Sequence, residues 1–445
     1  MSNFKENEIR AIRDIIINFL SKYGMYYENI DAQKQVDLFI QEMKNGLEGK
    51  ESSLQMFPTF IEYCGIVTEG EPVIVLDAGG TNLRSALLTF DKEKKPLVKN
   101  FKITSMPGLN HEVTKDNFFE TIVSSIKDIL GSSDKIGFVF SYPVKMFPDK
   151  DGILLRFTKE IKAREVEGQL IGKNLIDMIK KHGFSSKRIV ILNDTVASLL
   201  AGISEFYERQ FDSFIGLILG TGMNASYIEK NSEIIKGDIS GLNPDGYQII
   251  NIEAGNFGKG PRGEIDLKFD SKTLEPGSGS FEKMFSGAYL GGLAEEVLRF
   301  ALRDGVFSKN FSENFNNSFV IESKYIDGYL YFPPKDFKML KLLEKMDDSD
   351  RIKLYYLFDN LIERAALLVS VVLASAILKS NKGIDPCHPV CITAEGSSFY
   401  KMKNFQSRVD SYMQRILGER GTYYYEINRV ENAVLCGAAA AGLIG

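Results

Sequence analysis

The fold is decided by the stretch Val73–Leu87, which reads VIVLDAGGTNLRSAL. Val73–Leu76 is a short apolar run of the kind that forms a buried strand. A glycine turn follows, and Leu83–Phe90 then reads as a returning strand. The stretch therefore predicts a β-hairpin with Gly79 and Gly80 at its turn.

A second hairpin of the same kind begins at Phe214. The apolar run Phe214–Leu219 is followed by the turn Gly220–Gly222 and by a second strand pattern, Met223–Glu229. Two similar hairpins in one chain predict two related α/β halves that face each other. The sequence has no Pro- or Ser-rich linker, so we expect the chain to cross between the halves several times.

Other periodic segments surround the hairpins. The run Ala365–Leu378 is apolar except for two serines, but it is shorter than the roughly 20 residues needed to cross a bilayer, so it predicts a buried helix. Helices are expected at Glu8–Leu20, Ala32–Met43, Leu170–Lys181 and Val196–Ala201 and within Phe281–Leu302 and Asp350–Ser380. Further strands are expected at Ile136–Phe140 and Ile189–Leu192, and a strand with its turn at Val390–Gly396.

Bulk composition limits the classes of function. A chain of 445 residues is too long for one core, which favours two domains. The net charge of −5 argues against a nucleic-acid binder. The first ten residues, MSNFKENEIR, contain no apolar signal core, so we expect a cytoplasmic protein. We expect no membrane partner and infer no obligate protein partner.

The first glycine turn has the chemistry of a phosphate site. Adjacent Gly79 and Gly80 let backbone N–H groups approach a polyphosphate, and Thr81 and Asn82 add side-chain donors. Asp77 at the strand end can hold a hydrated Mg²⁺, which keeps most of its waters and takes few carboxylates. A tight hairpin turn without any ligand is the alternative reading.

Two further glycine elements add to this signal. The turn Gly220–Gly222 can close on the same phosphates, with the Thr221 hydroxyl as a donor. The element Ala394–Ser398, with Gly396 and Ser397, follows an apolar strand and can hold the adenosine end of a nucleotide. None of these elements matches a P-loop, and the chain lacks a Rossmann fingerprint.

Asp194 is the candidate general base. It follows the strand Ile189–Leu192 and precedes the helical pattern Val196–Ala201, where α/β proteins place ligands and where the helix dipole keeps a carboxylate ionised. The alternative is that Asp194 only caps the helix. The three histidines lie outside every glycine element, which leaves a carboxylate as the better base.

A series of motifs resembles that of hexokinases and glucokinases, in one consistent order from about Met56 to the end of the chain. The motifs are DAGGTNLR, Ser141-Tyr-Pro143, Thr158-Lys159, LNDTVASLLAG, LILGTGMNASYIE, NIEAGNFG, SFEKMFSGAYLGGL and AEGSSFYK. The resemblance implies an actin-like (ribonuclease H-like) α/β fold of two domains with ligands between them. It implies a small domain of residues 70–193 plus 433–445 and a large domain of residues 1–69 plus 194–432.

The resemblance also implies ATP-dependent phosphorylation of glucose, or of a related hexose such as mannose or fructose, at the 6-hydroxyl. Asp194 then corresponds to the catalytic base, and Lys159 lies near the transferring phosphate. Sugar-contacting positions are Ser141, Thr158, Lys159, Asn193, Asp194, Asn224, Glu253 and Glu282. ATP-binding positions are Asp77, Gly79, Gly80, Thr81, Asn82, Thr221, Gly222, Gly396 and Ser397, with Asp77 contacting Mg²⁺ through water.

Some positions depart from the family pattern. Glu395 stands where the family usually has Asp, and Gly279 stands where many relatives have a sugar-contacting Gln. These departures leave open a second hypothesis, a non-catalytic sugar sensor on the same fold. The retained Asp194 and phosphate turns favour the enzyme.

Overall fold

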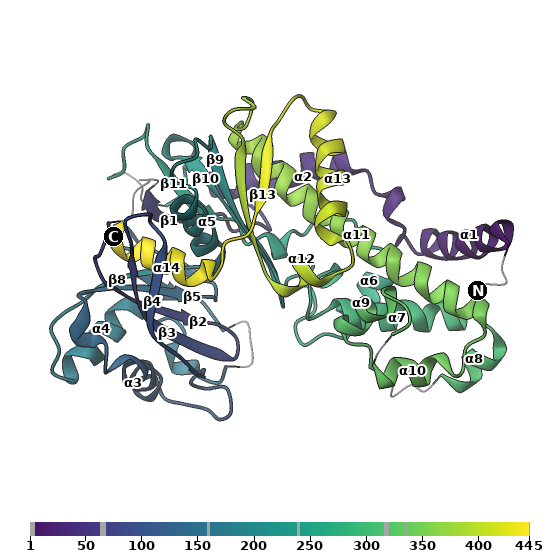
Figure 1. Cartoon of the computed structure of the whole chain (residues 1–445), viewed down its shortest axis with the longest axis horizontal. Helices are drawn as coiled ribbons and strands as arrows, with labels where there is room; N and C mark the ends of the chain where they lie inside the picture. Colours follow the sequence, from purple (N-terminus) through teal and green to yellow (C-terminus); the bar gives the residue numbers. More distant parts are fainter. Residues whose placement is uncertain are drawn as a thin grey trace.

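The computed structural model describes residues 5–62, 68–157, 161–237, 241–315, 320–334 and 336–444. Two β-sheets, each flanked by helices, organise the chain (Figure 1). The first sheet has the strand order β4 (Pro96–Ser105), β3 (Asn82–Phe90), β2 (Val73–Ala78), β5 (Lys135–Phe140) and β8 (Arg188–Leu192). The second has the order β1 (Phe57–Glu62), β11 (Tyr247–Asn251), β10 (Met223–Lys230), β9 (Ser213–Leu219), β12 (Val390–Glu395) and β13 (Tyr425–Asn428).

Both sheets are built on the same plan. In each, the first strand of the hairpin pairs antiparallel with the second, β2 with β3 and β9 with β10. That first strand also pairs in parallel with a later strand, β2 with β5 and β9 with β12. The predicted hairpins and the two related halves are therefore confirmed.

The helices have the following bounds. They are α1 (Glu6–Lys22), α2 (Ala32–Glu48), α3 (Lys115–Ile126), α4 (Ile171–Lys181), α5 (Asp194–Glu205), α6 (Glu264–Asp270), α7 (Leu290–Arg303), α8 (Lys309–Asn314), α9 (Ser323–Leu330), α10 (Phe337–Leu343), α11 (Asp348–Ser380), α12 (Ser397–Lys401), α13 (Phe405–Gly418) and α14 (Ala433–Ile444). A short ribbon of β6 (Val144–Met146) and β7 (Gly152–Leu154) follows β5.

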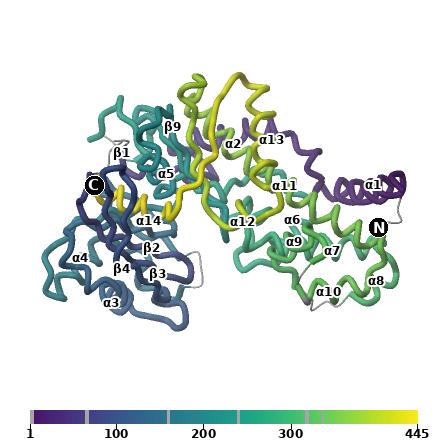
Figure 2. The backbone as a smooth tube through the Cα atoms, viewed as in Figure 1, coloured from purple at the N-terminus to yellow at the C-terminus, as the bar shows by residue number. Residues whose placement is uncertain are grey.

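Helices α5 and α14 join the two halves. Helix α5 packs on β9, β10 and β12 of the second sheet, and α14 packs on β2, β5 and β8 of the first. The backbone trace shows α5 near β9 and α14 near β2 (Figure 2). The two helices pack on each other so closely that a Cβ at Gly437 would lie 1.8 Å from the carbonyl oxygen of Ala197. The small-residue run that begins at Gly437 therefore serves close helix packing.

The chain crosses between the sheets after β1, after β8 and after β13, which confirms the expected multiple crossings. The predicted domain boundaries at 70, 193 and 433 stay a prediction.

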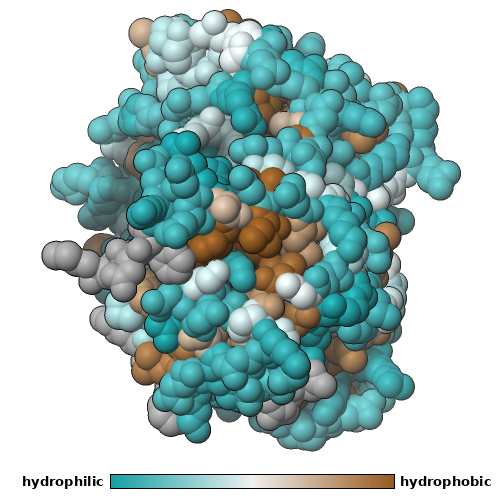
Figure 3. All heavy atoms as spheres, turned by 90° about the vertical axis from the view of Figure 1, so that its right-hand side faces the viewer, coloured by the Kyte–Doolittle hydropathy of each residue, from teal (hydrophilic) through white to brown (hydrophobic). Residues whose placement is uncertain are grey.

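Helix α11 is a core helix. By length and composition alone it could cross a bilayer, but 89% of its most apolar 18-residue window is buried inside the protein. Its apolar surface packs on α2, α9, α13 and β10 instead. The end of the molecule that carries α1, α8 and α10 is mainly polar, with one group of apolar side chains near its middle (Figure 3).

Candidate functional site

The first glycine turn lies between β2 and β3. The N–H of Gly79 donates to the carbonyl oxygen of Asn82 at 3.1 Å and closes the turn. Gly79 does not have the left-handed backbone that requires glycine, and a Cβ there would make only an ordinary 3.5 Å contact with the Asn82 oxygen. Neither turn geometry nor packing requires glycine at this position. The missing side chain instead leaves the space beside the turn open to a ligand, which favours the phosphate interpretation over a plain hairpin.

Asp77 is buried at the end of β2, beside this turn. Its Oδ2 is 2.9 Å from Nη1 of Arg84, the residue opposite it on β3. A single carboxylate next to a phosphate turn suits Mg²⁺ that arrives with its nucleotide and keeps its waters. The described residues contain no group of three or more His, Cys, Asp or Glu side chains that could hold a metal ion without such a ligand.

Tyr142, two residues after the end of β5, holds the same turn. Its hydroxyl donates to the carbonyl oxygen of Gly79 at 2.6 Å, and the neighbouring Ser141 N–H donates to the carbonyl of Ala78 at 3.2 Å. Burial, and next the charge of Asp77, raise the pKa of Tyr142, so its hydroxyl stays a donor. Sequence reasoning singled out Ser141 but missed Tyr142, although both belong to one quoted motif.

The second and third glycine elements touch each other. Gly396 has φ 109°, and a Cβ there would lie 2.2 Å from the carbonyl oxygen of Leu219, so only glycine fits. Ser398 Oγ donates to the carbonyl of Gly220 at 3.1 Å. The two predicted nucleotide elements, with the exposed Thr221 and Ser397, therefore share one end of the second sheet. Burial raises the pKa of Glu395, the last residue of β12 in this region.

The structure excludes one of the two interpretations of Asp194, the helix cap. The cap of α5 is Asn193, whose Oδ1 accepts the Thr195 N–H at 3.0 Å and the Thr195 hydroxyl at 2.8 Å. Asp194 is the first residue of the helix, where the dipole stabilises its negative charge. The alternative that Asp194 serves as the helix cap is therefore wrong, because the preceding side chain does so.

A chain of amide contacts connects the two halves beside Asp194. Nδ2 of Asn224, on β10, donates to Oδ1 of Asn251 at 2.8 Å and, more weakly, to Oδ1 of Asn193 at 3.4 Å. Nδ2 of Asn251 donates in turn to Oε1 of Glu253 at 2.8 Å. Three predicted residues are thus brought together. Asn251, the buried residue that links them, was missed even though it opens the quoted NIEAGNFG motif.

Glu253 and Glu282 both have special local structure. Glu253 has the left-handed backbone (φ 59°) that is uncommon for residues other than glycine and that recurs at functional sites. Oε2 of Glu282 accepts the Met223 N–H at 3.0 Å. A Cβ at Gly222 or Gly279 would lie 2.8 Å from an oxygen of Glu282, so these glycines make room for its carboxylate.

The short distance to the Glu282 carboxylate gives a structural reason for glycine at position 279. Two predicted residues, Thr158 and Lys159, lie outside the described residues.

Two family models, both described as hexokinase, match residues 21–204 and residues 214–444. The chain belongs to the hexokinase family. This hexokinase family member is 31% identical to hexokinase-1 of Rattus norvegicus over 395 residues, which cover 83% of this chain and 42% of the relative. It is 26% identical to hexokinase-7 of Oryza sativa subsp. japonica over 421 residues, which cover 89% of this chain and 90% of the relative. The chain thus spans less than half the length of rat hexokinase-1.

The expected fold is confirmed by comparison with solved hexokinase structures. A hexokinase from Schistosoma mansoni complexed with glucose aligns with a TM-score of 0.81 at 23% identity, covering 98% of this chain and 99% of that one. A second hexokinase structure aligns with a TM-score of 0.79 at 19% identity. At identities this low, the structural similarity establishes the fold alone. The fold is the actin-like α/β arrangement of two domains.

Proposed function

We propose that this protein transfers the γ-phosphate of MgATP to the 6-hydroxyl of glucose or of a related hexose, with Asp194 as general base. The proposal is carried by the position of Asp194. It lies at the N-terminus of α5, next to the amide contact between Asn193 and Asn224, and the helix does not need it as a cap. A carboxylate at the first position of a helix is kept ionised by the helix dipole and can accept a proton.

The surrounding side chains suit a hexose. Each sugar hydroxyl is both a donor and an acceptor, and the amides and carboxylates around Asn224, Glu253 and Glu282 offer both functions in fixed positions. Hydrogen bonds to Asn251 and to the Met223 backbone hold these side chains in place before a ligand arrives, which reduces the ordering cost of binding.

The glycine turns suit the polyphosphate. Backbone N–H groups at Gly80 and Thr221 can approach phosphate oxygens at the tips of the two turns. Asp77 would hold the Mg²⁺ that arrives with ATP, and the ion would neutralise charge on the phosphates. Asp194 orients the attacking hydroxyl and accepts its proton. Positioning and charge stabilisation are the main demands of phosphoryl transfer.

A non-catalytic sugar sensor remains the alternative, favoured by the departure at Glu395. A coupled assay of ADP release with MgATP, run with and without glucose, separates the two. We expect glucose-dependent ADP release together with hexose 6-phosphate formation. Glucose binding by calorimetry without any ADP release would contradict the proposal and favour the sensor. A cytoplasmic location stays a prediction.

Gly222→Ala tests the role of Glu282 in the hexose site. The new Cβ would lie 2.8 Å from Glu282 Oε2, the end of a flexible side chain, so the carboxylate must move while the fold survives. We expect the Kd for glucose, measured by calorimetry without ATP, to rise about tenfold, the scale of a lost hydrogen bond to a charged group.

Gly131→Ala is the matched control for this substitution. A Cβ at Gly131 meets no atom within 4 Å, and the glycine lacks a left-handed backbone. We expect this variant to bind glucose as the wild type does. Equal glucose affinity in Gly222→Ala would show that Glu282 does not bind the sugar.

A further inference from the structure

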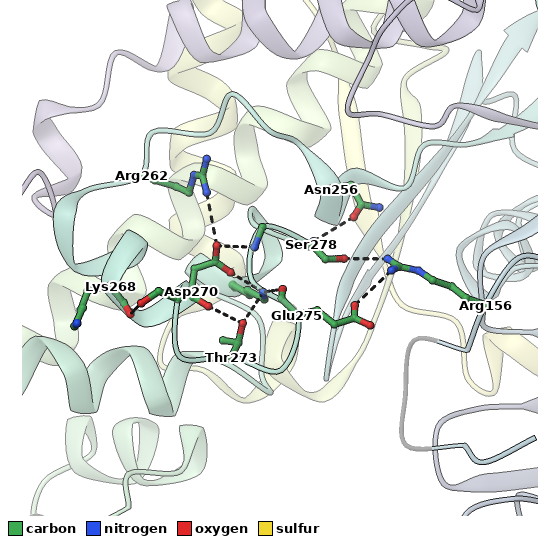
Figure 4. A network of polar contacts seen from close by, with 12 residues as sticks. Arg156, Asn256, Arg262, Lys268, Asp270, Thr273, Glu275 and Ser278 are labelled. Atoms are coloured by element: carbon green, nitrogen blue, oxygen red, sulfur yellow. Dashed lines mark hydrogen bonds and ion pairs between the residues drawn. The ribbon is translucent and has the colours of Figure 1, made fainter. Parts of the chain in front are cut away.

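Arg156 makes a polar contact between the two halves of the molecule. It follows β7, in the ribbon that extends from β5 of the first sheet. Its Nη2 donates to Oγ of Ser278 at 2.9 Å, and its Nη1 is 3.5 Å from Oε2 of Glu275 (Figure 4). Ser278 and Glu275 belong to the loop after α6, which packs against α7 on the side of the second sheet. One side chain therefore links both halves.

The loop that carries Glu275 and Ser278 is held in place by Lys283, the residue next to Glu282. Lys283 is buried, and its Nζ donates to Oδ1 of Asp270 at 2.6 Å, to Oγ1 of Thr273 at 2.8 Å and to the carbonyl oxygen of Glu275 at 2.6 Å. The other carboxylate oxygen of Asp270 accepts the N–H of Gly277 at 2.9 Å. These bonds fix the backbone that presents Glu275 and Ser278.

The segment that carries Arg156 is also held in place by neighbouring residues. The N–H of Phe157, directly after Arg156, donates to Oε1 of Glu167 at 2.9 Å. The Phe157 ring packs on the Tyr142 ring, with 4.9 Å between centroids and an interplanar angle of 84°. Tyr142 in turn holds the carbonyl of Gly79 in the first glycine turn. Arg156 therefore projects from a segment tied to the phosphate turn.

We propose that Arg156 is a positioning residue that clasps the two halves in the arrangement that binds hexose. This inference rests on the function proposed above. Arg156 contacts the loop that leads to Glu282. This contact of Arg156 with Ser278 and Glu275, the clasp, therefore favours the conformation in which residues of both halves surround the sugar. Arg156 contacts no group assigned to the chemistry, so its removal is expected to weaken hexose binding and to spare turnover.

The expected size of the effect on glucose affinity follows from the solvent exposure of the two paired side chains. The Arg156 and Glu275 side chains are 48% and 55% exposed, and exposed ion pairs usually contribute little because solvent and salt screen them. Anchored neighbours on both sides lower the entropic cost of holding this pair together. We therefore expect an effect of about threefold on affinity, near the upper end for exposed pairs.

The experiment is a double-mutant cycle with Arg156→Gln, Glu275→Gln and the double variant, all as full-length chains. Glucose Kd by calorimetry and glucose KM are expected to rise about threefold in Arg156→Gln and by less in Glu275→Gln, which keeps the hydrogen bond from Arg156 to Ser278, with kcat within twofold of the wild type in both. The double variant is expected to match Arg156→Gln, because the ion pair is lost only once. Added NaCl should raise the wild-type Kd toward that of Arg156→Gln, and Arg156→Lys should restore part of the affinity.

Lys95→Gln is the matched control. Lys95 also pairs across the halves, with Glu205 of α5, but it lies in the β3–β4 turn, at the opposite end of β3 from the first glycine turn. We expect its glucose affinity to equal that of the wild type.

Unchanged affinity in both single variants, or strictly additive effects in the double variant, would reject the clasp. A fall in kcat as large as the rise in KM would also reject it, by placing Arg156 in the chemistry. If the wild type neither binds nor phosphorylates hexose, the proposed function fails, and the clasp is then judged by small-angle scattering. A larger radius of gyration for ligand-free Arg156→Gln than for the wild type supports it, and equal radii reject it.

Discussion

Asp194→Asn is expected to fold as the wild type does, to bind glucose and to form hexose 6-phosphate at least about a hundredfold more slowly. Asparagine keeps the size and most of the hydrogen-bonding shape of the side chain but cannot accept the proton of the 6-hydroxyl. General-base contributions of about 10²–10⁴-fold set this expectation. Because Asn193 caps α5, the substitution leaves the cap intact. Steady-state kinetics, calorimetry and thermal melting together test it.

The control for this substitution is Asp347→Asn. Asp347 caps α11 by accepting the N–H of Asp350, and asparagine caps a helix about as well as aspartate does. We expect this variant to keep both its melting temperature and its kcat. Near-normal turnover in Asp194→Asn would remove Asp194 as the base, and a collapse of its melting temperature would assign it a structural role instead.

Lys159→Ala is expected to lower kcat by about 10²-fold, the scale of a lost electrostatic donor at a developing charge. The resemblance to hexokinases places this lysine near the transferring phosphate, where an ammonium group stabilises the charge of the transition state. The effect should appear in kcat, because the interaction is stronger in the transition state than in the bound substrate.

Lys162→Ala, three positions along, removes an exposed lysine from the same segment. Surface substitutions of this kind are usually close to neutral, so we expect its kcat to stay within about twofold of the wild type. If Lys159→Ala behaves in the same way, Lys159 is a surface lysine without a role in phosphoryl transfer.

The two hairpins could be predicted from the sequence because their signals are local. Apolar runs on either side of a glycine turn define β2 with β3 and β9 with β10 without reference to the rest of the chain. The ordered motifs then pointed to the family, and the expected helices recur with ends shifted by a few residues.

Several strands escaped prediction for a physical reason. β4 (Pro96–Ser105) is exposed or partly exposed at every residue, so it has no alternation of buried and exposed positions to detect. It is a strand because β3 offers a partner edge. β13 (Tyr425–Asn428) is only half-buried throughout and is likewise defined by its pairing with β12.

By itself, the sequence determined the two glycine hairpins, the family and the candidate base Asp194, because each is recognised from short stretches of consecutive residues. Only the tertiary structure decided that Asn193 and not Asp194 caps α5, which depends on the side-chain orientation at the helix start. It also decided which distant residues meet. The contacts of Asn224 with Asn193, and of Arg156 with Ser278, arise when the two sheets pack around α5 and α14, and no local pattern specifies such a meeting.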